Sequence, residues 1–241
     1  MADARLEPRL LWADPWLLAL VKPAGLLSQP GLGPHLADSL ISRARRRWPE
    51  ALLVHRLDRD TSGLLLLARD STTHRRLSAA FAERRVRKAY RARVRGVPQA
   101  RGGLIDQPLG RIGTRPPRYG VVPPERGGRP ALTRWRRLTR GGDPCAGGLP
   151  EAWSDLLLQP ITGRSHQLRA HLAWLGHPVL GDRLYSEEGS SEEGSGEEGS
   201  GPSLQLRACG LRLLHPHTGM PLRLRWDGPS RLDPLPEAPR L

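Results

Sequence analysis

The sequence has few lysines and few cysteines. Only Lys22 and Lys88 are lysines among its 38 cationic side chains, and its two cysteines, Cys145 and Cys209, form no Cys-x-x-Cys pair. This cysteine usage argues against a disulfide framework and a thiolate zinc site, and it is typical of a reducing cytosol. No apolar run approaches the roughly 18 residues of a membrane span, and no signal peptide is evident. We therefore expect a cytoplasmic protein without a membrane segment.

Acidic residues are outnumbered, with 24 Asp and Glu against 38 Lys and Arg, a net charge of +14 and a pI near 11.3. Such a surplus favours a polyanionic partner, because each neutralised phosphate releases condensed counterions. A solvated basic surface without a partner is the alternative. The preference for arginine over lysine is usually an effect of codon composition, so by itself it indicates little about chemistry. The two lysines indicate positions that suit a compact ammonium, or they are chance.

The hydrophobic pattern predicts more strands than helices, and the two do not alternate strictly. Strands are expected at 10–13, 17–21, 63–68, 86–94, 132–138, 153–159, 211–214 and 222–226, and helices at 37–48, 71–85 and 164–175. This order favours the α+β class, with a mixed, mostly antiparallel central sheet and flanking helices. We expect one domain over residues 1–241, without a separate N-terminal RNA-binding domain.

Residues 186–202 form a near repeat of Glu, Gly and Ser that contains six glutamates and no apolar side chain. Such a segment buries too little to offset its ordering entropy, so a flexible surface loop is expected. It is either an inert insertion or an acidic tether that competes with RNA for the basic surface.

A carboxylate, Asp58, lies in the run His55-Arg56-Leu57-Asp58-Arg59-Asp60-Thr61-Ser62-Gly63, just before a buried strand. A sheet can hold such a carboxylate rigidly toward a cleft, although an isolated aspartate here is more often a turn residue. A second run, from Gly163 to Leu172, begins the last helix. Arg164 falls where the helix dipole disfavours a cation, which suggests an acidic partner, and Asp58 is the candidate. A phosphate contact is the alternative role for Arg164.

The histidines of this second run, His166 and His171, are five apart and lack a carboxylate at metal spacing. We therefore expect no metal site.

These runs together resemble the RluA-type pseudouridine synthases, and within them the synthase A subgroup. The resemblance extends from Leu10 to Trp226 and includes further motifs, which are Lys22-Pro23-Ala24-Gly25, Lys88-x-Tyr90-x-Ala92 and Gly176-His177-Pro178-x-x-Gly181-Asp182-x-x-Tyr185. The sequence departs from the family pattern at Arg207, where a histidine is usual, and at Arg129, where a lysine is usual.

The resemblance implies cofactor-free isomerisation of uridine to pseudouridine within RNA. Asp58 would attack the sugar or remove a proton from it, Arg164 would hold the carboxylate, and Tyr90 would stack on the uracil. Residues expected to contact the substrate are Lys22, His55, Arg56 and Leu168.

The expected substrates of a synthase A type enzyme are a 23S rRNA hairpin loop and the first nucleotide of the tRNA anticodon loop, and we expect a monomer. The alternatives are the same chemistry at another rRNA or tRNA site, or a catalytically silent RNA-binding or ribosome-assembly factor.

Overall fold

The computed structural model describes residues 6–114, 117–141, 152–185 and 203–227, which fall into two compact units. The first unit contains the described residues up to Leu57, Ser62–Val86 and the described residues from Ala208 on. The second contains Asp58–Thr61 and the described part of Arg87–Arg207. The acidic segment 186–202 and Cys145 lie outside the described residues. No helix within the described ranges is long and apolar enough to cross a membrane.

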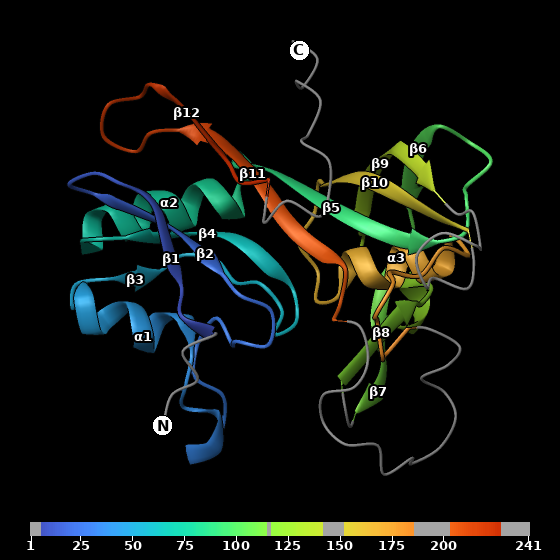
Figure 1. Cartoon of the computed structure of the whole chain (residues 1–241), viewed down its shortest axis with the longest axis horizontal. Helices are drawn as coiled ribbons and strands as arrows, with labels where there is room; N and C mark the ends of the chain where they lie inside the picture. Colours follow the sequence, from blue (N-terminus) through green and yellow to red (C-terminus); the bar gives the residue numbers. More distant parts are fainter. Residues whose placement is uncertain (1–5, 115–116, 142–151, 186–202, 228–241) are drawn as a thin grey trace. The chain divides into compact units, whose positions relative to one another are not determined.

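The first unit is a sheet with two helices (Figure 1). Its elements are β1 (Arg9–Ala13), β2 (Leu17–Lys22), α1 (Leu40–Arg47), β3 (Leu52–Leu53), β4 (Ser62–Ala68), α2 (Ser71–Ala82), β11 (Leu206–Leu214, of which residues 208–214 belong here) and β12 (Pro221–Arg225). The strand order is β1-β2-β4-β11, with β3 beside β4 and β12 beside β11. Strand β2 is buried along its whole length, and so is β4 after its first residue. These two strands are therefore apolar on both faces.

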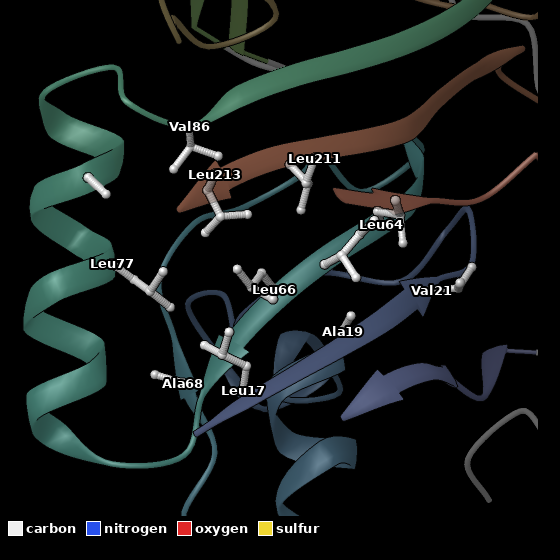
Figure 2. Packing of buried hydrophobic residues seen from close by; sticks show 12 residues of the cluster. Leu17, Ala19, Val21, Leu64, Leu66, Ala68, Leu77, Val86, Leu211 and Leu213 are labelled. Carbon is white, nitrogen blue, oxygen red and sulfur yellow. The ribbon is translucent and has the colours of Figure 1, made fainter. Parts of the chain in front are cut away.

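Every second residue of the strands points into one core cluster, as Figure 2 shows for Leu17 of β2, Leu66 of β4 and Leu213 of β11. Leu77 of α2 packs against this cluster. The helix begins where the sequence predicts, because the Asp70 carboxylate accepts a 2.8 Å hydrogen bond from the N–H of Thr73.

Gly63 allows two strands of this unit to approach closely. Its φ is +117°, and a Cβ at this position would overlap the backbone oxygen of Ala208 in β11. Only glycine meets both conditions at low cost, which accounts for the glycine that closes the run from His55.

The second unit contains four neighbouring strands of a sheet, a two-stranded hairpin and one α-helix, which Figure 1 labels. Its elements are β5 (Arg87–Arg95), β6 (Gly102–Asp106), β7 (Leu109–Thr114), β8 (Pro117–Val121), β9 (Leu132–Gly141), β10 (Trp153–Pro160) and α3 (Gln167–Trp174). The sheet order is β5-β10-β9-β6, and β7 pairs with β8. These pairings are antiparallel, so the expected α+β class is confirmed.

The sequence patterns do not predict strands β6, β7 and β8. Residues 102–121 are rich in Gly, Pro and Arg, and most of the described side chains there are exposed or half-buried. The hydrophobic alternation that indicates a strand is therefore weak in this part of the chain.

Candidate active site

Asp58 opens the short segment Asp58–Thr61 of the second unit, and its side chain is half-buried. The N–H of Thr61 donates to the Asp58 carbonyl at 3.2 Å, which closes a tight turn. The residue before it, Leu57, is fixed in the first unit by the hydroxyl of Ser28. That hydroxyl accepts from the Leu57 N–H at 3.0 Å and donates to the Leu57 carbonyl at 2.7 Å. The backbone on both sides of the carboxylate is therefore held in place.

The start of α3 is organised by one buried amide side chain, that of Gln167. Its oxygen accepts from the Thr162 hydroxyl at 2.8 Å and from the Arg164 N–H at 2.9 Å. Its nitrogen donates to the Leu132 carbonyl and to the Thr133 hydroxyl, both at 3.0 Å. All four hydrogen-bonding positions of the amide are thus used, so the loop before the helix is rigid.

Arg169 of α3 is a buried cation whose charge interacts with that of Asp58. The guanidinium is buried and donates to both oxygens of Asp182, through Nε at 2.7 Å and Nη2 at 2.6 Å. It also lies 5.1 Å from the centre of the Tyr185 ring. Burial opposes the charge on Arg169, but the hydrogen bonds and charge of Asp182 outweigh it. With a further contribution from Asp58, they raise the pKa of Arg169 above its ordinary value. The result is a fixed cation within electrostatic reach of the Asp58 carboxylate.

Arg164 has a different partner from the one that the sequence suggests. Its Nε donates to the carbonyl oxygen of Pro130 at 3.1 Å. It also precedes the helix, which begins at Gln167, so the argument from the helix dipole does not apply to it. The structure joins Asp58 electrostatically to Arg169 instead.

Sequence reasoning missed the arrangement around Arg169. A signal was present, because Asp182 and Tyr185 stand in the Gly181-Asp182-x-x-Tyr185 motif, and these are the residues that hold the guanidinium.

Tyr90 and Leu168 lie in the same apolar cluster of the second unit. Leu168 is 7 % exposed, and the half-buried Tyr90 packs against that cluster from β5. Tyr90 is paired in register with the buried Leu158 of β10. The structure therefore brings the predicted tyrosine and the predicted apolar residue together on one face of the sheet.

His166 and Tyr185 form a second aromatic contact near the start of α3. His166 adopts a left-handed backbone conformation with φ +51°, and its Nδ1 lies 3.1 Å from the Tyr185 hydroxyl. The same hydroxyl accepts from the N–H of Tyr119 in β8 at 3.0 Å. Burial raises the pKa of Tyr185 to about 12, so this phenol is neutral and can donate to His166.

The remaining predicted contacts belong to the first unit. Lys22 is fully buried, and its ammonium donates to the carbonyls of Pro23 at 2.9 Å and Leu26 at 2.7 Å. The ammonium thus stabilises its own loop, and no surface of Lys22 is exposed.

His55 and Arg56 differ in their surroundings. The half-buried His55 accepts from the N–H of Leu66 at 2.9 Å and stacks on Phe81 with ring centres 4.5 Å apart. Arg56 is exposed, as a side chain that contacts RNA must be.

Comparison with known proteins identifies the family. The family described as RNA pseudouridylate synthase matches residues 17–174. The chain belongs to this family. The dual-specificity RNA pseudouridine synthase RluA of Salmonella typhimurium is 40 % identical over 210 residues, which cover 87 % of this chain and 88 % of the relative. The RluA protein of Escherichia coli K12 is 38 % identical over the same shares of the two chains.

Solved structures agree with this assignment. Human RNA pseudouridylate synthase domain containing 1 is 29 % identical with a TM-score of 0.74, and it covers 95 % of this chain and 87 % of its own. The human domain containing 4 is 27 % identical with a TM-score of 0.69, covering 92 % and 88 %.

As a member of the pseudouridine synthase family, the protein is an isomerase that forms pseudouridine in RNA. The described residues contain no group of three or more His, Cys, Asp or Glu side chains placed to hold a metal ion.

Proposed function

We propose that this pseudouridine synthase modifies a hairpin loop of 23S rRNA and the first nucleotide of the tRNA anticodon loop. It would act in the cytoplasm as a monomer, without a cofactor. The support is the RluA relatives, whose name describes dual specificity, together with the synthase A motifs of the sequence. A net charge of +14 suits a substrate that is itself a polyanion.

In the proposed reaction Asp58 acts on the ribose of the target uridine. The bond between N1 and C1′ breaks, the uracil rotates, and a new bond forms between C5 and C1′. The proton on C5 is lost and N1 ends protonated, so the product is an isomer of the substrate. Asp58 either forms an ester at C1′ or removes a sugar proton to give a glycal, and both routes require an anionic carboxylate.

The arginine in this proposal is Arg169. Its guanidinium is held by Asp182 and by the Tyr185 ring, so no reorganisation is needed to stabilise the negative charge on Asp58. Tyr90 would stack on the uracil and Leu168 would form the apolar floor beneath it. The exposed Arg56 would fill the space left when the target base leaves its stack, which costs a few kcal/mol.

The observation that carries the proposal is the buried guanidinium of Arg169, which two hydrogen bonds to Asp182 hold in place and whose charge interacts with that of Asp58. The test is to map pseudouridine in rRNA and tRNA from cells that lack the gene, complemented with wild type, Asp58→Asn or Asp60→Asn. Asp60 is an exposed aspartate two residues further on and serves as the matched control. We expect wild type and Asp60→Asn to restore the same uridines, and Asp58→Asn to restore none.

Each other outcome points to a different error. Restoration by Asp58→Asn would refute the catalytic role of Asp58 and favour a silent RNA-binding factor. Loss of modification at other sites would move the substrate assignment and leave the chemistry intact. If purified wild type converted no uridine in total RNA from the deletion strain, the synthase activity itself would be refuted.

A further inference from the structure

Lys88 lies on the strand that carries the predicted uracil-stacking tyrosine. It precedes Tyr90 by two residues on β5, so the two side chains leave the same face of the strand. Its side chain is half-buried, whereas that of Arg87, which points to the other face, is exposed.

The ammonium of Lys88 reaches the loop before α3. A Cβ on Gly163 would lie 3.4 Å from the Lys88 Nζ, so the glycine leaves the ammonium against bare backbone. This loop is the one that Gln167 makes rigid through the Arg164 N–H. The ammonium of this strand residue therefore lies next to the loop that leads into α3, the helix that carries Leu168 and Arg169.

No anion compensates this half-buried cation in the part of the chain that the structure describes. Neither a hydrogen bond nor an ion pair to a carboxylate is found for Lys88 among those residues. Burial is the one cause that changes its pKa, and it lowers the pKa of Lys88 below the ordinary value of a lysine. A partly desolvated ammonium of this kind gains more from an incoming anion than an exposed one does.

The rarity of lysine adds an independent argument. Thirty-six of the 38 cationic side chains are arginines, which leaves Lys22 and Lys88. The Lys22 ammonium is accounted for, because it is buried against two carbonyl oxygens of its own loop. Lys88 has no such partners among the residues that the structure describes, and its compact ammonium lies close to the Gly163 backbone.

We propose that Lys88 binds a phosphodiester group of the RNA next to the target uridine and so positions that nucleotide over Asp58. The inference rests on the proposed function and deepens it by assigning one backbone contact. A charge-assisted hydrogen bond of about 1.5–3 kcal/mol corresponds to roughly a 10- to 100-fold change in affinity.

The experiment pairs protein variants with single phosphate changes in the RNA. The probe is a synthetic anticodon stem-loop in which each loop phosphate in turn is replaced by a neutral methylphosphonate. Affinity is measured by fluorescence anisotropy for wild type, Lys88→Met, Lys88→Arg and the matched control Arg87→Met. Circular dichroism confirms that each variant is folded, and conversion to pseudouridine is measured separately on the unmodified hairpin.

We expect one methylphosphonate, adjacent to the target, to weaken wild type and Arg87→Met about 10-fold or more, and to weaken Lys88→Met less than about 2-fold. Lys88→Arg should recover part of this phosphate dependence. On the unmodified hairpin, Lys88→Met should raise KM more than it lowers kcat.

Two results separate the failures. If every methylphosphonate weakened Lys88→Met as much as wild type, Lys88 would not contact the backbone and the proposal would be overturned. If the phosphate coupling were found but wild type converted no uridine, the contact would stand and the proposed function would fail.

Discussion

The buried pair of Arg169 and Asp182 permits the most direct test of how the site is built. Their side chains are 5 % and 0 % exposed, and two short hydrogen bonds join them. Replacing Asp182 with Asn removes the negative charge and keeps one acceptor oxygen, which leaves a buried guanidinium uncompensated. Breaking a buried pair in this way costs about 3–5 kcal/mol. Because Asn keeps one acceptor, we expect Asp182→Asn to lower the free energy of unfolding by about 3 kcal/mol. A typical protein has a total stability of roughly 5–15 kcal/mol, so the variant should still fold.

The assay is urea unfolding followed by circular dichroism, together with conversion of an RNA hairpin at a temperature where the variant is folded. The matched control is Glu83→Gln. This residue pairs with Arg85 at 2.6 Å, but both side chains are more than half exposed, so the loss there should be below about 1 kcal/mol. We also expect Asp182→Asn to lower kcat, because Arg169 is no longer fixed beside Asp58. A stability loss for Asp182→Asn no larger than that of Glu83→Gln would refute the reasoning.

Three further predictions concern other positions. Gly63→Ala should lower the free energy of unfolding by about 2–5 kcal/mol, because the methyl group meets the Ala208 backbone at a positive φ; urea unfolding measures this. Arg169→Gln should reduce kcat/KM for an RNA hairpin at least about 100-fold, and Arg164→Gln less than about 10-fold, since the buried charge of Arg169 interacts with Asp58 whereas Arg164 donates to the Pro130 carbonyl. Burial lowers the pKa of His171 below its ordinary value, so stability should fall as pH drops from about 6.5 toward the folded-state pKa, because only the unfolded chain takes up the proton there. Unfolding at pH 7.5 and about 5.5 should show a larger decrease for wild type than for His171→Gln.

Contrary results would be informative for each position. A urea unfolding midpoint for Gly63→Ala equal to that of wild type would mean that β4 and β11 move apart at this point at little cost. Equal losses for the two arginine variants would return Arg164 to the catalytic set. The same decrease with pH in wild type and His171→Gln would remove this histidine from the pH dependence.

The sequence predicts best where one physical pattern dominates. The apolar run of β4 and the start of α2 fall where expected, because burial and capping leave local signals. Strands β6 to β8 leave only a weak signal, since most of their described side chains are exposed or half-buried. The sequence pattern places Gly63 at the start of a strand, but the need for glycine there comes from Ala208, far away in the chain.

The arginine of the site shows what periodicity cannot provide. Arg164 and Arg169 stand in the same ten-residue run, and position relative to a helix start favours Arg164. Which of the two arginines is fixed by a carboxylate depends on Asp182, and this residue lies beyond the helix in the sequence. Lys22 gives the opposite lesson, because a lysine in a shared motif proves to bond to its own loop.

The contrast between the two lysines has a practical consequence for chemical labelling. Acylating reagents attack unprotonated amines, and Lys22 offers them no exposed surface. Lys88 is half-buried, and its lowered pKa leaves a larger fraction of the amine unprotonated at neutral pH than an ordinary lysine has. A mild amine-reactive dye should therefore label Lys88, which is close to Tyr90 on β5. A decrease in the labelling rate of Lys88 when RNA is added would then report occupancy of the site without any measurement of turnover.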